Sequence, residues 1–257
     1  MDLSQLKGYN GNKNLKRSNQ AIEWTPNLIE EYVRCSDDPI YFIETYMKII
    51  NINDGLVNFK LYPYQREMVT AMKENRFNII ATARQAGKST VTCGFILWYI
   101  IFHSEKTVAL LANKGETARE ILGKVQLAYE HLPRWLQHGV KEWNKGSFEL
   151  ENNSRVIAAA TSKDGIRGYA INLLFIDEAA FIENWDEFFT SVYPTISSGK
   201  ESKVVLVSTP NGLNHFYSLW INARENRNGY HPIEVTWDRV PGRDSKWKED
   251  TLASMNF

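Results

Sequence analysis

Short apolar runs, each of a length typical of a buried strand, recur along the chain and alternate with segments of helical periodicity. The runs lie at residues 79–81, 106–112, 171–176, 203–207 and 233–237, and the helical patterns at residues 93–102, 117–132, 185–193 and 213–223. Two further segments, 147–150 and 155–159, are joined by Asn152 and Asn153 and predict a β-hairpin. The alternation favours an α/β fold with a mostly parallel central sheet flanked by helices.

The first 60 residues have a different pattern. Residues 1–25 are mostly polar and carry several basic side chains, which predicts a disordered basic tail that can touch nucleic acid or a partner. Residues 26–34 have helical spacing, and Asp38 followed by Pro39 is a helix start that places apolar residues as far as Ile50 on one face. We therefore expect a small helical N-terminal appendage over residues 26–60, a core over 61–240 and a C-terminal segment over 241–257.

Composition narrows the class of protein. The 257 residues carry 30 basic and 30 acidic side chains, so the net charge of +0 excludes a chain that is strongly basic as a whole and leaves only local basic patches. Cys35 and Cys93 lie in apolar, helix-like surroundings and are predicted to be reduced, buried thiols. The N-terminus has no signal-peptide pattern, and residues 95–102 fall far short of the ~20 apolar residues that a membrane helix needs.

A phosphate-binding loop is predicted between the strand at 79–81 and the helix at 93–102. Gly87 allows a phosphate to approach the backbone, Lys88 supplies a positive charge, and Ser89 offers a hydroxyl ligand for Mg²⁺. Thr82 stands where the pattern G-x-x-x-x-G-K-S/T has its first glycine, and Arg84 can reach a γ-phosphate from within the same subunit. The alternative is a chance Gly-Lys-Ser on a surface turn. The predicted nucleotide-binding loop consists of Thr82, Ala83, Arg84, Gln85, Ala86, Gly87, Lys88, Ser89 and Thr90.

Two adjacent carboxylates end the apolar run at 171–176. Asp177 can hold Mg²⁺, and Glu178 can orient and deprotonate a water for attack on a γ-phosphate. Together with the phosphate loop they predict ATP hydrolysis with Mg²⁺ as the cofactor. The strand at 106–112 separates the two motifs in the sequence and indicates a P-loop NTPase of the ASCE type, in which an extra strand lies between the motifs and the glutamate is catalytic.

Three further positions have a functional and a structural interpretation. Gln65 can pair with the edge of an adenine, or it is a surface residue of an amphipathic helix. Ser208 and Thr209 can sense a γ-phosphate, or they cap the turn at 210–212. Arg167 can reach the γ-phosphate of a neighbouring subunit as an arginine finger, or it is a solvated loop residue.

These motifs carry a resemblance to a known family. The chain resembles the ATPase part of the large terminase subunit of tailed, T-even-type bacteriophages, over nearly its whole length and most strongly from residue 62 onward. The segments that match are ARQAGKST (83–90), LLFIDE (173–178), VSTPNGLNHFY (207–217), EWNKGSFEL (142–150), YQRE (64–67) and the pair Arg167–Gly168. A phosphate loop that lacks the first glycine and contains an arginine is a known deviation in this family.

The resemblance implies a role for each matched residue. Arg84 corresponds to a cis-acting arginine, Lys88 and Ser89 to the ligands of phosphate and Mg²⁺, and Asp177 to the Mg²⁺ aspartate. Glu178 corresponds to the catalytic carboxylate and Ser208–Thr209 to the coupling motif. Gln65 corresponds to the adenine contact, and Arg167 to the trans finger.

The resemblance also implies partners. Members of the family package double-stranded DNA into a procapsid in the bacterial host's cytoplasm, as a homo-oligomeric ring on the portal protein and alongside a small terminase subunit. Full-length members carry a C-terminal nuclease domain, so we expect no nuclease activity in a chain that ends at Phe257. Two alternatives are a helicase-like DNA translocase, which needs a second RecA-like domain, and a nucleotide-gated portal-docking module with low turnover.

Overall fold

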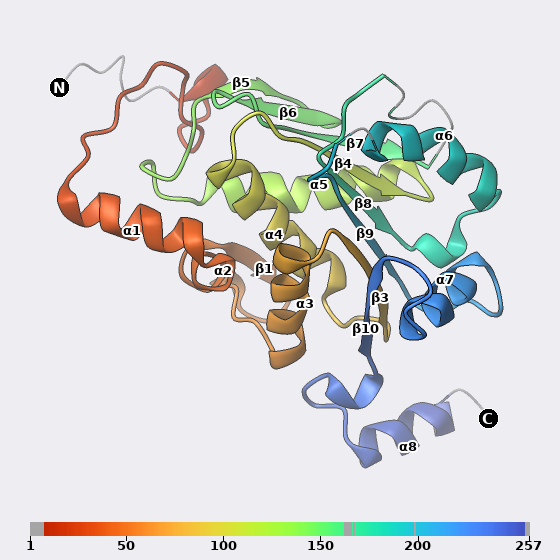
Figure 1. Ribbon diagram of the computed structural model, residues 1–257. Coiled ribbons are helices and arrows are strands. Elements are labelled where there is room, and N and C mark those ends of the chain that lie inside the picture. The colour runs from red at the N-terminus through yellow and green to blue at the C-terminus, as the bar shows by residue number, and fades with distance from the viewer. Residues whose placement is uncertain (1–7, 162–165, 167, 198, 255–257) are drawn as a thin grey trace.

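One twisted sheet runs through the centre of the molecule (Figure 1). The computed structural model describes residues 8–161, 166, 168–197 and 199–254. The strand order is β10-β3-β9-β8-β4-β7-β6-β5, parallel from β10 to β7 and antiparallel for β6 and β5. The strands are β3 (Phe77–Thr82), β4 (Thr107–Ala112), β5 (Val140–Trp143), β6 (Ser147–Leu150), β7 (Arg155–Ala160), β8 (Leu173–Asp177), β9 (Lys203–Ser208) and β10 (Tyr230–Val235). The predicted mostly parallel α/β sheet and its hairpin (β6–β7) are confirmed.

Helices cover both faces of this sheet. Because successive side chains on a strand point to opposite faces, Ile80 joins the core beneath the earlier helices, whereas Ile79 joins the core beneath the later ones. The earlier helices are α1 (Pro26–Asp37), α2 (Pro39–Tyr46), α3 (Pro63–Glu74), α4 (Lys88–Phe102) and α5 (Gly115–Glu130), and the later ones are α6 (Trp185–Ser197) and α7 (His215–Arg224). The last helix, α8 (Ser245–Ser254), contributes no residue to either core. Helix α8 lies apart at the end of the sheet nearest β10 (Figure 1). Within the described part of the chain, no helix has the length and hydropathy required to cross a bilayer.

The strand that separates the two motifs in the sheet is β9. It pairs in parallel with β3 on one side and with β8 on the other, whereas the strand that lies between the motifs in the sequence, β4, pairs with the far side of β8. Ser208 is thereby opposite Ala81, and Asp177 is opposite Val207, so the carboxyl ends of β3, β9 and β8 meet at one edge. The predicted ASCE arrangement requires a strand between the two motif strands, and the sheet has one. That strand is β9, which follows both motifs in the sequence, and not β4, which separates them in the sequence.

The N-terminal segment differs from the predicted disordered tail. Leu15 is buried, and the Lys16 backbone N–H donates to Gln137 Oε1 at 3.0 Å. Arg17 forms a parallel bridge with Val140 on β5, the edge strand of the sheet. Residues 9–19 are therefore held in place by contacts with residues more than a hundred positions later, which local polarity does not reveal; residues 1–7 lie outside the described part.

The predicted second helix is shorter than its apolar spacing suggested. Helix α2 begins at Pro39 with Asp38 as its N-cap, as predicted, but it ends at Tyr46. Ile50 lies instead on β1 (Lys48–Asn51), which pairs with β2 (Gly55–Asn58) in an antiparallel hairpin. The Asn51 side chain accepts hydrogen bonds from the backbone of Asn53 and Asp54 and closes the turn. This turn chemistry ends the helical pattern that the apolar spacing alone would continue.

Candidate functional site

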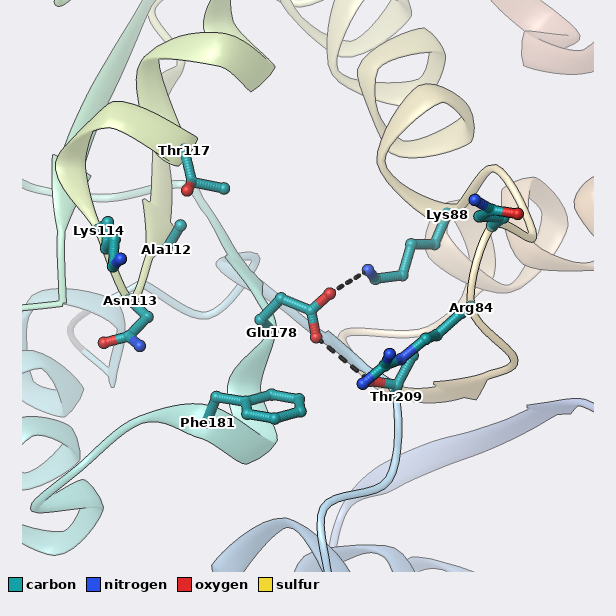
Figure 2. Close-up of a pocket in the computed structure, with 10 residues that line it drawn as sticks. Arg84, Lys88, Ala112, Asn113, Lys114, Thr117, Glu178, Phe181 and Thr209 are labelled. Atoms are coloured by element: carbon teal, nitrogen blue, oxygen red, sulfur yellow. Dashed lines mark hydrogen bonds and ion pairs between the residues drawn. The ribbon is translucent and has the colours of Figure 1, made fainter. Parts of the chain in front are cut away.

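A cavity of about 530 Å³ opens at the edge where β3, β8, β9 and β4 end (Figure 2). In a parallel sheet the carboxyl ends of the strands are the usual place for a ligand. The phosphate loop forms one wall, Glu178 and Thr209 form the middle, and the start of α5 forms the opposite wall. The lining residues are Arg84, Gln85, Lys88, Ala112, Asn113, Lys114, Thr117, Glu178, Phe181 and Thr209.

The loop between β3 and α4 has the backbone of an anion-binding turn. Gln85 and Gly87 both have left-handed conformations, with φ of 58° and 73°, and α4 begins directly after Gly87. The first N–H groups of a helix lack partners within the helix, so they and the helix dipole favour a negative charge at this end. The left-handed φ favours glycine at position 87, and a Cβ there would lie 2.7 Å from the Gln65 amide nitrogen, so that the Gln65 side chain would have to shift.

Four side chains of the two predicted motifs meet at the base of the cavity. Ser89 Oγ donates to Asp177 Oδ2 at 2.8 Å. Lys88 Nζ lies 2.6 Å from Glu178 Oε1 and 3.4 Å from Asp177 Oδ1. The sequence places these groups about 90 positions apart, and the sheet brings the lysine, the hydroxyl and the two carboxylates together as predicted.

The charge of Lys88 is fixed by its surroundings. Burial on its own lowers the pKa of this ammonium, but the carboxylates of Asp177 and Glu178 outweigh burial, so the pKa of Lys88 lies above its usual value. Lys88 is therefore a cation at neutral pH.

Glu178 has an uncommon backbone for a residue with a side chain. Its φ of 52° and ψ of 42° lie in the left-handed region, which the surrounding structure has to enforce. The second carboxylate oxygen, Oε2, is 3.5 Å from both the Ser208 and the Thr209 hydroxyl oxygens. Ser208 Oγ also accepts a hydrogen bond from the Ala180 backbone N–H at 3.1 Å. The end of β9 is thus in contact with both the carboxylate and the backbone of the β8 turn.

Gln65 lies beneath the loop rather than on the surface. Its side chain is buried and donates to the Ala86 carbonyl at 3.3 Å, while its Oε1 accepts from the Tyr62 backbone N–H. The Tyr64 hydroxyl donates to the same Ala86 carbonyl at 3.0 Å. These bonds place Gln65 in contact with the phosphate loop, and its adenine contact stays a prediction.

The remaining loop residues lie in different surroundings. Arg84 is exposed on the cavity wall near Thr209 (Figure 2), and its carbonyl accepts a hydrogen bond from Arg243 at 2.9 Å. Thr82 is buried at the end of β3, and the Ala83 N–H donates to the Val235 carbonyl. Thr90 lines a separate groove beside β1. Arg167 lies outside the described residues.

The wall opposite the phosphate loop was missed by sequence reasoning. Asn113, Lys114 and Thr117 come from the end of β4 and the start of α5, and Phe181 from the turn after Glu178 (Figure 2). Asn113 and Lys114 are exposed and belong to no recognised motif. The one signal available was position, because they follow a parallel strand whose carboxyl end faces the same edge as that of β8.

Comparison with known proteins identifies a family. The family model described as "terminase large subunit, T4likevirus-type, N-terminal" matches residues 79–255. The large terminase ATPase domain of Thermus phage P74-26 has a similar structure, with a TM-score of 0.62 at 19% identity, covering 76% of this chain and 88% of that one. The large terminase of bacteriophage HK97 gives a TM-score of 0.67 at 18% identity, covering 85% of this chain and 47% of that one.

A third similar structure carries a nucleotide. The large terminase of a thermophilic bacteriophage, in complex with ATP-gamma-S, gives a TM-score of 0.58 at 12% identity and covers 75% of this chain and 49% of that one. This chain therefore spans about half the length of the two larger terminases. At these identities the structural likeness shows the fold, a P-loop NTPase fold shared with terminase ATPase domains.

Proposed function

The chain belongs to the family of T4-type large terminase subunits, whose N-terminal part it matches over residues 79–255, and from this premise we propose that it is an ATP hydrolase. We propose further that hydrolysis drives double-stranded DNA into a procapsid. One observation carries the ATPase proposal: Lys88, Ser89, Asp177 and Glu178 converge within hydrogen-bonding or ion-pair distance at the edge of a cavity.

The oxygen ligands fit Mg²⁺. Mg²⁺ prefers oxygen donors and is commonly held by one or two carboxylates together with substrate phosphates. The Ser89 hydroxyl and the Asp177 carboxylate lie 2.8 Å apart beside the phosphate loop, so both can serve one ion. When bound there, Mg²⁺ neutralises charge on the β- and γ-phosphates.

Different groups of the protein would bind the phosphates, activate the water and respond to hydrolysis. The backbone N–H groups at the start of α4 bind the phosphates, and a triphosphate in the loop competes with the two carboxylates for Lys88. Once Lys88 turns toward the phosphates, Glu178 is free to orient a water and accept its proton during attack on the γ-phosphate. Ser208 and Thr209 already contact Glu178, so they are placed to respond when that carboxylate moves.

The translocation proposal rests on the family. Arg84 is exposed on the cavity wall, where it can approach a γ-phosphate in cis. We propose the portal protein, the small terminase subunit and further copies in a ring as partners, and the host cytoplasm as the location. We also propose Arg167 as a trans finger.

The test is a separation of binding from turnover. Glu178→Gln removes the base and keeps the shape, so ATP turnover is expected to fall about 100-fold or more while a fluorescent ATP analogue still binds. Glu249→Gln, an exposed change on α8, is the matched control. Unchanged turnover in Glu178→Gln would contradict the role of Glu178. Turnover of the unsubstituted chain is measured with and without DNA and portal, since a docking module would hydrolyse little in either case.

A further inference from the structure

The backbone that follows Glu178 is held from outside by one segment, residues 208–215. Ala179 and Ala180 form the short turn after Glu178, and both are buried. The Ser208 hydroxyl accepts from the Ala180 N–H, as described above. Two side chains at the start of α7, Asn214 and His215, bind the carbonyls of the same turn and belong to no role assigned so far.

His215 reaches the turn with an aligned ring. Its Nε2 lies 2.7 Å from the Ala179 carbonyl oxygen, which requires that Nε2 carries the proton. The ring stacks on Trp185 with centroids 4.7 Å apart and planes 6° apart, and Trp185 is buried and stacks on Phe189 as well. The stack fixes the plane of the imidazole and so directs its N–H at the carbonyl. This donor is available in both the neutral Nε2–H tautomer and the cation.

Asn214 holds the adjacent carbonyl. Its Nδ2 donates to the Ala180 oxygen at 2.7 Å, and Asn211 adds a longer bond of 3.3 Å to the same oxygen. At the same time Asn214 Oδ1 caps α7 by accepting from the Phe216 and Tyr217 N–H groups. One amide therefore joins the start of α7 to the turn after Glu178.

These contacts explain how Glu178 stays in the left-handed region. A non-glycine residue there is strained, by about 1–3 kcal/mol in general, and persists only where its neighbours enforce it. The Ala179 and Ala180 carbonyls are bound by the side chains of His215 and Asn214, and the Ala180 N–H is bound by the Ser208 hydroxyl. Of these three residues only Ser208 also contacts the Glu178 carboxylate, whereas His215 and Asn214 bind the backbone of the turn.

We propose that His215, supported by Asn214, is a positioning residue that keeps the Glu178 carboxylate directed at Lys88 and the cavity by fixing the Ala179–Ala180 turn. The inference deepens the proposed ATPase function and rests on it. It also implies that α7 and Glu178 move as one unit, because the two are joined by these hydrogen bonds.

The test uses two substitutions of His215 that separate its hydrogen-bond donor from its aromatic stacking. His215→Phe keeps an aromatic ring to stack on Trp185 and loses the donor, whereas His215→Gln keeps an N–H donor and loses the stack. For His215→Phe we expect the kcat for ATP to fall about 10- to 100-fold, since a small displacement of a catalytic group has effects of that size. The affinity of His215→Phe for a fluorescent ATP analogue should change less than about threefold. His215→Gln, which keeps a donor, should retain most of the turnover of the unsubstituted chain. His231→Phe, an exposed ring on β10, is the control.

A purely structural role would give another pattern. Loss of stability, nucleotide affinity and kcat in parallel in both His215 variants would overturn the inference, and so would a kcat in His215→Phe within twofold of the unsubstituted chain. If His215→Phe does not fold, Asn214→Ser replaces it. Serine still caps α7 but lacks the amide that binds Ala180, so the same selective loss of kcat is expected.

A second readout separates this inference from the ATPase proposal. Hydrogen exchange in a peptide spanning residues 178–182 should be faster in His215→Phe and unchanged in His231→Phe, whether or not ATP is hydrolysed. If the unsubstituted chain binds nucleotide without turnover, the proposed function fails while faster exchange still supports the positioning of Glu178. Equal exchange rates in both variants would overturn the positioning role.

Discussion

Lys88 and Glu178 form an ion pair, in which the Lys88 ammonium nitrogen lies 2.6 Å from a carboxylate oxygen of Glu178. The contact joins the first residue of α4 to the residue directly after β8. In the proposed reaction Lys88 binds phosphate and Glu178 orients the attacking water and accepts its proton. The ion pair therefore has to separate before either residue can act. ATP binding would then release the base that hydrolysis needs.

Loss of the Lys88 charge should destabilise the fold. Lys88→Met leaves Asp177 and Glu178 without their cation, and because Asp177 is nearly buried we expect a loss of about 1–3 kcal/mol in the free energy of unfolding. Urea unfolding measures it. Adding Glu178→Gln should recover part of the loss, because it removes one of the two unpaired charges. A double variant that is no more stable than Lys88→Met would argue against the ion pair.

The stability difference between the unsubstituted chain and Lys88→Met should depend on pH. The pKa of Lys88 in the folded chain lies above its ordinary value of 10.5. The stabilising charge is therefore fully present below that value and is lost as the pH rises through the higher, folded-state pKa. The difference in unfolding free energy between the unsubstituted chain and Lys88→Met should stay constant from about pH 7 to 9 and shrink above about pH 11. A difference that already changes near pH 8 would contradict the assignment.

Gly87→Ala should damage the phosphate loop in two separable ways. The φ of 73° costs a side chain about 1–2 kcal/mol, and the new Cβ would also meet the Gln65 amide at 2.7 Å. Gly242→Ala is a matched comparison, because φ is 82° and nothing lies within 4 Å of its Cβ. Urea unfolding should therefore show a larger loss for Gly87→Ala, together with weaker binding of an ATP analogue. Equal losses at the two glycines would show that the Gln65 contact relaxes freely.

Arg243 should affect nucleotide binding from outside the cavity. Its guanidinium donates to the Arg84 carbonyl and lies over the Trp247 ring, so it ties the segment before α8 to the phosphate loop. Removing one such hydrogen bond in Arg243→Ala should raise the KM for ATP about three- to tenfold, with a smaller change in kcat. Lys246→Ala, an exposed change on α8, should leave KM unaltered. A KM that does not respond to Arg243→Ala would mean that the loop holds its shape without this contact.

Both cysteines should be unreactive in the folded chain. Burial raises the pKa of the Cys35 and Cys93 thiols to about 12, so at pH 8 only on the order of one molecule in ten thousand is a thiolate at either site. A thiol reagent such as DTNB should label neither cysteine until urea unfolds the protein, and then both. Rapid labelling of one thiol at pH 8 without urea would show local opening at that site.

The sequence predicts the parts of the site that local chemistry defines. The loop around Gly87 and the pair Asp177–Glu178 each follow an apolar strand, and in a parallel sheet the ends of such strands share one edge. For this reason the convergence of Lys88 with both carboxylates could be anticipated without coordinates. The position of Gln65 beneath the loop could not, because its burial depends on how α3 packs on the sheet.

What sequence reasoning missed depends on long-range contacts. Lys114 enters the cavity only because β4 lies beside β8, and His215 reaches Ala179 only because α7 starts beside the β8 turn. Neither residue has a motif of its own. The hairpin β1–β2 was missed for a different reason: apolar spacing cannot tell a short strand from the end of a helix when an Asn turn follows it.

The bridge between Arg17 and Val140 has a consequence for handling the protein. Strand β5 is an edge strand of the sheet, and unpaired backbone groups along an edge strand can pair with other chains. Residues 9–19 cover part of that edge, where Arg17 and Ser18 contact Val140. Proteolytic trimming up to residue 18 should therefore promote self-association, detectable as high-mass species in size-exclusion chromatography, even though the cavity is untouched.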